Sequence, residues 1–219
     1  MPSSAALHPA QHADALCLHQ LMVARGDLML CGPLAAEIQA GQIWQLAGPN
    51  GTGKTTLLMM LAGILPCDPA QLSWRGQPPI GWSALYIGHA AGLNSSLTVW
   101  ENLQFLCGLY AQSVSADQLL SAIERVGLAG YEEVVVARLS SGQKRRVQLA
   151  RLWLPESPEL WLLDEPLTAL DVRMVAALNT RLQQHAVQGG RVVLTSHQPV
   201  VAVTHQLDLD AARMMSLEE

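Results

Sequence analysis

The fold of this 219-residue chain is decided by one stretch, Gly48-Pro49-Asn50-Gly51-Thr52-Gly53-Lys54-Thr55-Thr56. It fits the pattern G-x-x-x-x-G-K-[ST], a loop whose backbone N–H groups surround the phosphates of a nucleotide. Its glycines allow backbone angles and a close approach that a Cβ atom would block. Lys54 supplies a positive charge for the β- and γ-phosphates, and the Thr55 hydroxyl can coordinate Mg²⁺. We therefore predict that the chain binds a nucleoside triphosphate.

The segments on either side of the loop are those that the motif requires. Residues 42–47 are short and largely apolar, which predicts a strand. Apolar residues then recur at helical spacing from Leu57 to Leu65, and Pro66 ends the predicted helix. The N-terminus of that helix favours an anion through its dipole and its unpaired N–H groups. A glycine-rich turn that binds nothing is the alternative, and this context disfavours it.

Composition limits the class of protein. The length predicts one domain. Hydrophobic residues make up 50% of the chain and charged residues 14%, which leaves room for an apolar docking face or reflects a large buried sheet. The net charge of −5 argues against a nucleic-acid partner, since phosphate neutralisation needs a basic face. No apolar run approaches the roughly 20 residues of a membrane-spanning helix.

The N-terminal residues and the cysteines indicate a cytosolic protein. Residues 1–15 lack the basic and apolar regions of a secretory signal, and we expect a loose tail there. Three early histidines would allow a metal site, but such a tail explains them better: His8, His12 and His19. Four cysteines show no C-x-x-C pairing and are expected to be reduced thiols: Cys17, Cys31, Cys67 and Cys107.

Short apolar segments on both sides of the phosphate loop predict further strands. Short apolar segments (16–23, 28–31 and 34–38) are broken by Arg25-Gly26-Asp27 and by Gly32-Pro33, which predicts a small antiparallel sheet. Residues 71–75 are a candidate additional strand of that sheet, and residues 84–88 predict a further strand that ends at His89.

The middle of the chain is helical. Thr98 with Glu101 and Ser115 with Gln118 form two capping boxes, each followed by apolar residues on one helix face. Behind the first box these residues are Leu103, Leu106, Cys107 and Tyr110; behind the second they run to Val126, with Gly127 as a stop. A third helix is predicted from about Gly142, with Val147, Ala150 and Leu154 on one stripe.

Strand signals return in the last third. Leu160-Trp161-Leu162-Leu163 is a continuous apolar run, as expected for a strand buried on both faces of a parallel sheet. A helix is predicted over about 171–188 and a strand over 192–194. The fold class is therefore α/β: a P-loop NTPase (RecA-like) parallel-sheet core, an N-terminal antiparallel β subdomain and an inserted α-helical subdomain at about 91–156. We expect one ATPase domain over 16–205, with 206–219 as a C-terminal segment.

Three strand ends carry residues suited to phosphate chemistry, because ligands of open α/β sheets bind beyond the carboxyl ends of the strands. Asp164 suits Mg²⁺, as does Thr55 of the loop. Glu165 points the other way and could polarise an attacking water, while His197 could contact the γ-phosphate and hold that water. The alternatives are two solvated carboxylates and a structural histidine.

A second helix N-terminus also suits an anion. Leu139-Ser140-Ser141-Gly142-Gln143 is rich in small residues and hydrogen-bond donors ahead of the third predicted helix. A second copy of the chain could present this terminus to a nucleotide held by the first, which would give two shared sites in a dimer. A capped surface helix is the simpler alternative for the string taken alone.

Together these motifs resemble the ATP-binding cassette (ABC) ATPases. GPNGTGKTT resembles the Walker A motif, LSSGQKRRV the signature motif, and LWLLDEP the Walker B strand with its catalytic glutamate. Residues 168–171 resemble the D-loop, which ends at Asp171, and residues 195–197 resemble the switch-histidine segment. The resemblance implies a homodimer in which Walker A of one subunit faces the partner's signature motif across ATP and Mg²⁺.

Three positions depart from that family's pattern. Ser141 stands where a second glycine is usual, and a small side chain should still allow closure. The aromatic residue that stacks on adenine is missing, and Arg25 or Gly26 occupies its region. At the Q-loop position the usual glutamine is His89.

His89 and the strings ARLWLPESPELWLLDEPLTALD and GGRVVLTSHQPV resemble the CcmA family, ATPases of cytochrome c biogenesis and haem export. That resemblance implies a peripheral subunit on the cytoplasmic face of the inner membrane, with the integral partners CcmB, CcmC and CcmD. ATP hydrolysis would power haem handling through release of the haem chaperone CcmE. The chain contains no C-x-x-C-H haem-attachment motif.

Two other functions stay open. One is an ATPase subunit for another ABC exporter, of drugs or lipids, which the co-purifying partner would distinguish. The other is a soluble ABC ATPase of translation or DNA repair, although such proteins usually carry two cassettes or a long coiled-coil insertion. A P-loop GTPase is weaker still, because no N-K-x-D element occurs.

Overall fold

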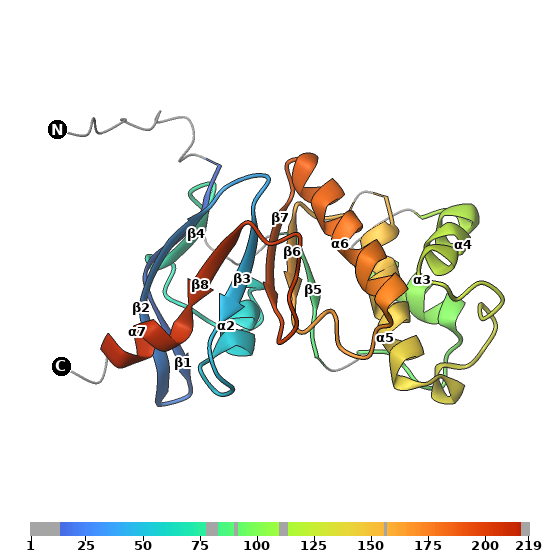
Figure 1. The fold of residues 1–219 in the computed structure, drawn as a ribbon, viewed down its shortest axis with the longest axis horizontal. Coiled ribbons are helices and arrows are strands. Elements are labelled where there is room, and N and C mark those ends of the chain that lie inside the picture. Colours follow the sequence, from blue (N-terminus) through green and yellow to red (C-terminus); the bar gives the residue numbers. More distant parts are fainter. Residues whose placement is uncertain (1–13, 78–82, 90–91, 110–113, 156, 216–219) are drawn as a thin grey trace.

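The computed structural model describes residues 14–77, 83–89, 92–109, 114–155 and 157–215 (Figure 1). Two sheets form the framework. The antiparallel sheet has the order β2-β1-β4, and its strands are β1 (Leu16–Arg25), β2 (Leu28–Ile38) and β4 (Leu72–Trp74). The five-stranded sheet has the order β5-β6-β7-β3-β8, and its strands are β3 (Ile43–Ala47), β5 (Ala84–Ile87), β6 (Leu160–Leu163), β7 (Arg191–Thr195) and β8 (His205–Asp208). Its neighbouring strands pair in parallel, as the β–helix–β alternation predicts.

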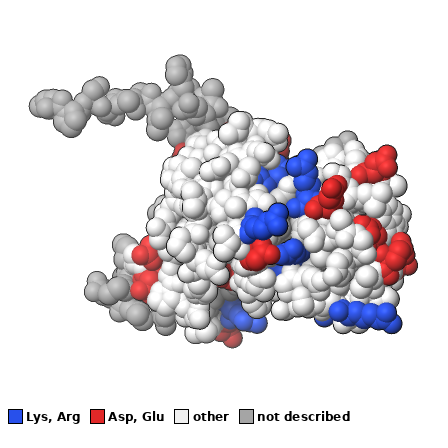
Figure 2. All heavy atoms as spheres, turned by 45° about the vertical axis from the view of Figure 1, so that its right-hand side comes forward, with Lys and Arg blue, Asp and Glu red and all other residues white. Residues whose placement is uncertain are grey.

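The helices divide into groups around these sheets. They are α2 (Lys54–Leu61), α3 (Val99–Leu109), α4 (Ala116–Arg125), α5 (Ser141–Ala150), α6 (Val172–Val187) and α7 (Leu209–Met215), with 3₁₀ turns at η1 (Val136–Arg138) and η2 (Arg151–Trp153). In Figure 1, α5 and α6 lie beside the five-stranded sheet and α3 and α4 lie beyond them. The face in Figure 2 has broad areas without charged side chains, in keeping with the low charged fraction.

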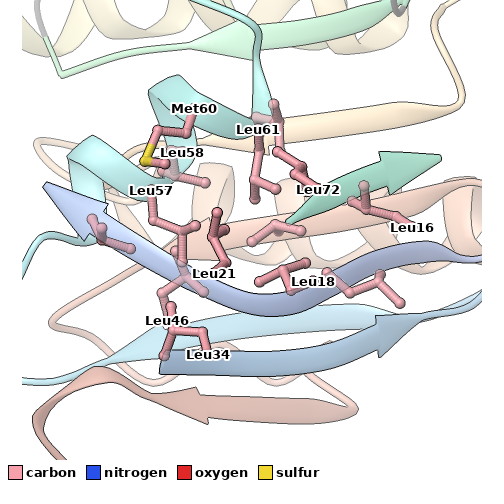
Figure 3. Close-up of a cluster of buried hydrophobic side chains, with 14 of the residues drawn as sticks. Leu16, Leu18, Leu21, Leu34, Leu46, Leu57, Leu58, Met60, Leu61 and Leu72 are labelled. Atoms are coloured by element: carbon pink, nitrogen blue, oxygen red, sulfur yellow. The ribbon is translucent and has the colours of Figure 1, made fainter. Parts of the chain in front are cut away.

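Helix α2 fills the space between the two sheets. Figure 3 shows Leu57, Leu58 and Leu61 of this helix packed among leucines of the strands. All three side chains are fully buried, and each such burial stabilises the fold by about 1.5–3 kcal/mol. The helix that follows the phosphate loop is therefore fixed by the core.

The α-helical region has a core of its own. Both predicted capping boxes are present, between Thr98 and Glu101 ahead of α3 and between Ser115 and Gln118 ahead of α4. Leu103 of α3, Ile123 of α4 and Val147 of α5 meet in one buried cluster. Tyr110, predicted on the same face, lies outside the described residues.

The break predicted at Gly32-Pro33 is wrong, because β2 runs unbroken from Leu28 to Ile38. The Gly32–Pro33 peptide bond is cis, and the register with β1 shifts here. A Cβ on Gly32 would lie 2.8 Å from the Leu21 carbonyl oxygen, so glycine permits a close strand contact. Pro33 is tolerated because β2 is an edge strand.

Two helix ends also differ from the predictions. Helix α2 ends at Leu61 and does not reach Leu65, since Gly63 adopts a left-handed φ of 67° just beyond it. Helix α5 ends at Ala150, and the buried Leu154 follows η2.

The C-terminal segment, for which the sequence predicts no helix or strand, contacts both sheets. Strand β8 pairs with β3, and α7 packs against β2. The sequence gives no strand signal at β8 because its four residues are polar or only partly buried. Among the described residues, no helix is long and apolar enough to cross a bilayer.

The cysteines are free thiols, as predicted, and Cys17, Cys31 and Cys107 are buried. Burial raises the pKa of the Cys31 thiol to about 11, so this group is an inert part of the core.

Candidate functional site

The phosphate loop connects β3 to the first turn of α2. Gly48, Gly51 and Gly53 have φ angles of 132°, 85° and 98°, a region that glycine enters without strain. A Cβ on Gly48 would lie 2.9 Å from the Thr52 hydroxyl, and one on Gly53 would lie 3.1 Å from a Val23 methyl. A side chain at Gly48 or Gly53 would therefore be crowded, whereas a Cβ on Gly51 would meet nothing within 4 Å.

Lys54 and the helix N-terminus make the loop attractive to an anion. The Lys54 ammonium donates to the carbonyl oxygens of Gly48 at 2.6 Å and Pro49 at 2.8 Å, which holds it over the loop. The first turn of α2 contains no acidic residue that would oppose an anion. Six residues of the motif help to line a cavity of about 640 Å³: Asn50, Gly51, Gly53, Lys54, Thr55 and Thr56. This volume falls in the range of small-molecule sites.

Asp164 lies directly across from Thr55. The Thr55 hydroxyl donates to one carboxylate oxygen of Asp164 at 2.9 Å, and the Thr195 hydroxyl donates to the other at 2.7 Å. Asp164 is only 3% exposed, so the carboxylate is stabilised by these two hydroxyls. The pair Thr55 and Asp164 fits Mg²⁺, which takes one or two protein oxygens and completes its coordination with phosphates and water. No cluster of three or more potential ligands occurs among the described residues.

Glu165 and His197 meet at the edge of the same cavity. One carboxylate oxygen of Glu165 accepts from the His197 backbone N–H at 3.2 Å, and the other lies 3.5 Å from the imidazole Nε2. The Gln45 amide donates to the Ser196 carbonyl oxygen at 3.0 Å and fixes the segment that carries the histidine. The structure thus brings together the two residues predicted to orient water.

Arg145 ties α5 to the ends of β5 and β6. Its guanidinium donates to the carbonyl oxygens of Gly88 at 2.8 Å and Asp164 at 2.7 Å. Burial lowers the pKa of Arg145, while the nearby charges of Asp164 and Glu165 act in the opposite direction. Arg145 therefore connects the helix of the signature motif to the residue that precedes His89 and to the Walker B carboxylates.

The signature motif begins α5 and lies outside the nucleotide cavity of its own chain. Ser140 is the N-cap, and its hydroxyl accepts from the Gln143 N–H at 3.2 Å while the Gln143 side chain accepts from the Ser140 N–H at 2.9 Å. Ser140 to Gln143, all described, are absent from the lining of the 640 Å³ cavity. Ser141 lines a separate pocket of about 230 Å³ that also includes His89 and Glu165.

Asp171 has two contacts within the chain. One carboxylate oxygen caps α6 by accepting from the Met174 N–H at 2.8 Å, and the other pairs with the Arg146 guanidinium. The bond from Met174 and the pairing with Arg146 lower the pKa of Asp171. The D-loop is thereby joined to the signature helix.

His89 and Arg25 lie at two of the three positions that depart from the family pattern. His89 is exposed and lines both the 640 Å³ cavity and an adjoining groove of about 400 Å³. That groove lies between the sheet and α3 and includes Tyr86 and Leu106. Arg25 lines the large cavity together with Leu28 and neighbouring residues.

Comparison with known proteins agrees with this geometry. Residues 31–168 match the family described as ABC transporter. The chain belongs to the ABC transporter family. This ABC protein is 44% identical over 188 residues to the "Cytochrome c biogenesis ATP-binding export protein CcmA" of Vibrio cholerae, a match that covers 83% of this chain and 90% of the relative. The protein of the same name from Escherichia coli K12 is 43% identical over 187 residues, with 83% and 88% covered. These findings confirm the predicted resemblance.

Solved structures support the fold of this ABC protein. A putative ABC transporter ATP-binding protein from Pyrococcus furiosus superimposes with a TM-score of 0.80 at 23% identity, covering 91% of this chain and all of the other. A structure titled as the ATP-binding subunit of an ABC transporter gives a TM-score of 0.73, also at 23% identity, covering 84% and 79%. The α/β fold with a parallel core sheet and a separate antiparallel sheet is confirmed.

Two residues near the site were missed by sequence reasoning. In the sequence Thr195 stands out only as part of the switch-histidine segment, and its signal is a polar residue at the end of an apolar strand. Arg145 lies within the signature string LSSGQKRRV, and the one signal of its own is a basic residue on the buried side of a helix.

Proposed function

We propose that this ABC protein is the ATP-hydrolysing subunit of a membrane complex for cytochrome c maturation, and that it powers haem handling and release of the haem chaperone CcmE. The observation that carries the proposal is the 43–44% identity to proteins named CcmA, over more than four-fifths of the chain. The arrangement of Lys54, Asp164 and Glu165 around one cavity supports hydrolysis as the activity.

The proposed reaction is transfer of the γ-phosphoryl group of ATP to water. Lys54 and the N–H groups of the phosphate loop bind and orient the phosphates. Glu165 and His197 orient the attacking water in line with the bond that breaks, between the γ-phosphorus and the bridging oxygen of ADP. Thr55 and Asp164 would hold Mg²⁺, which when bound offsets negative charge on the phosphates.

A second copy would complete each site. Ser140 to Gln143 of one subunit would face the γ-phosphate held by its partner, with Gly142 allowing close approach. The capped, donor-rich N-terminus of α5 outside the cavity supports this arrangement. Opening of the dimer after hydrolysis would move the helical region.

The proposed partners are CcmB, CcmC and CcmD, with CcmE and haem acting indirectly, at the cytoplasmic face of the inner membrane. The groove beside His89 and Leu106 would receive the membrane partner, since it joins the nucleotide cavity to the helical region. Through that groove, movement of the residues around the γ-phosphate would reach the membrane partner.

Affinity purification of the tagged chain from membranes tests this function. Mass spectrometry should identify CcmB with the chain, and a deletion strain should lack mature cytochrome c. A Lys54→Ala variant should still capture CcmB but fail to restore cytochrome c, which separates assembly from ATP use. Recovery of an unrelated permease, with normal cytochrome c in the deletion strain, would contradict the proposal.

A further inference from the structure

One buried hydroxyl contacts both residues of the Asp164-Glu165 pair. Leu163 of β6 lies opposite Leu194 of β7 in the parallel register, so the next residues, Asp164 and Thr195, are neighbours. Thr195 is 1% exposed and closes β7. Its hydroxyl donates to an Asp164 carboxylate oxygen at 2.7 Å and accepts from the Glu165 N–H at 2.8 Å. Both hydrogen-bonding roles of the Thr195 hydroxyl are thus directed at the two carboxylate residues.

The Glu165 backbone needs such a partner. Its φ angle is 50°, in the left-handed region that a residue with a Cβ rarely adopts. Such a conformation persists only where the surroundings hold it, and it often marks a functional site. The Thr195 hydroxyl accepts the N–H of this residue, so it fixes the peptide plane from which the Glu165 side chain leaves toward His197.

The same bond acts on Asp164. Its carboxylate has two oxygens, one bonded to Thr55 and the other to Thr195. Thr55 is exposed and belongs to the phosphate loop, whereas Thr195 belongs to a buried central strand. The Thr195 bond therefore keeps the Asp164 carboxylate from rotating when the Thr55 hydroxyl turns to a ligand.

We propose that Thr195 is a positioning residue for ATP hydrolysis, which sets the orientation of Glu165 and Asp164 together through its hydroxyl. This inference rests on the proposed ATPase function. A Thr195 that only stabilises the fold would lower the midpoint of thermal unfolding when its hydroxyl is removed, without changing the turnover of the folded protein. Valine suits this comparison because it has nearly the same volume and is favoured in a buried strand.

Substitutions that differ only in the hydroxyl separate the two roles. Thr195→Val removes both hydrogen bonds at constant shape, and Thr195→Ser keeps the hydroxyl. Thr204→Val is the control: the exposed Thr204 hydroxyl likewise donates and accepts one hydrogen bond each, both with the Ile43 backbone at the start of β3. Each variant would be purified as the full chain with its membrane partner, and kcat and KM for ATP would be measured with the midpoint of thermal unfolding.

We expect Thr195→Val to lower kcat by about 10- to 100-fold while KM changes by less than about threefold, because misplacement of reacting groups affects turnover more than ground-state binding. Thr195→Ser and Thr204→Val should stay within about threefold of the wild-type kcat. If Thr195→Val does not fold, Thr195→Ser and Thr195→Ala give the same contrast, with activity retained only by serine.

The inference is overturned if Thr195→Val keeps kcat within about threefold of wild type, or if Thr204→Val lowers it equally. It is also overturned if Thr195→Ser is as slow as Thr195→Val. A wild-type complex without ATPase activity would instead contradict the proposed function, so the two failures are distinguishable.

Discussion

Gly142 of the signature motif lies against the Ala169 carbonyl oxygen of the D-loop, and a Cβ on this glycine would stand 2.7 Å from that oxygen. The contact joins the N-terminus of α5 to the segment that follows Glu165. Glycine at this position is therefore required inside the single chain, independently of any nucleotide held by a partner.

We predict that Gly142→Ala displaces the D-loop and lowers ATP turnover by at least about tenfold, because the backbone oxygen cannot move without shifting Asp171. Gly108→Ala in α3 is the matched control, since a Cβ at that position would meet no described atom outside its own helix within 4 Å. That control should stabilise the fold by about 0.5–1 kcal/mol through helix propensity. Steady-state ATPase assays and chemical denaturation check both, and equal activity of the two variants would refute the D-loop contact.

Arg145→Met should destabilise the fold by about 2–3 kcal/mol, because the buried carbonyl oxygens of Gly88 and Asp164 lose their donors. It should also reduce kcat, since the second of these carbonyl groups belongs to Asp164 itself and Glu165 is the next residue. Arg145→Lys should recover part of both losses.

The matched control for Arg145 is Arg181→Met. Arg181 donates to the Leu152 carbonyl oxygen at 2.6 Å and stacks over Trp161, away from the cavity. Urea unfolding should show a lower free energy of unfolding for both arginine variants, whereas kcat should fall only for Arg145→Met. A normal kcat in Arg145→Met would show that this arginine does not act on the site.

His185 should make the stability depend on pH. Burial lowers its pKa from 6.5 to about 4, with nearby Arg181 acting in the same direction, while the imidazole stacks on Trp161 at 3.6 Å between ring centroids. Between these pH values the unfolded chain binds the proton and the folded chain does not. The stabilisation is therefore present above pH 6.5 and is lost as pH falls toward 4, by at most about 3 kcal/mol.

Urea unfolding of the wild type and of His185→Gln from pH 7.5 to 4.5 measures this effect. The difference in unfolding free energy between the two proteins should shrink as the pH falls. A difference independent of pH would mean that His185 is not buried in its neutral form.

Sequence patterns predicted the parts of the fold in which local chemistry and tertiary structure agree. The Ser115–Gln118 capping box and the apolar strand 160–163 are examples, since each needs only a few adjacent residues. Strand β8 could not be predicted, because polar residues become a strand there only through pairing with β3. The break predicted at Gly32-Pro33 is wrong for the opposite reason. These two residues locally favour the end of a strand, but pairing with β1 continues β2 through them.

The same distinction holds for the site. Motif residues such as Lys54, Asp164 and Glu165 were assigned from spacing, and the structure brings them around one cavity. Contacts of Thr195 and Arg145 depend on the register of β6 with β7 and on the packing of α5 against strand ends. Neither relationship is encoded in adjacent residues.

Glu165→Gln is the decisive variant for ATP hydrolysis in a shared dimer. The variant should bind ATP with Mg²⁺ but not hydrolyse it. With ATP, light scattering should give twice the mass of the 23.6 kDa chain, whereas with ADP it should give the mass of the monomer. A variant that hydrolyses ATP at the wild-type rate, or that loses turnover without retaining ATP and forming the dimer, would contradict both the role of Glu165 and the shared site.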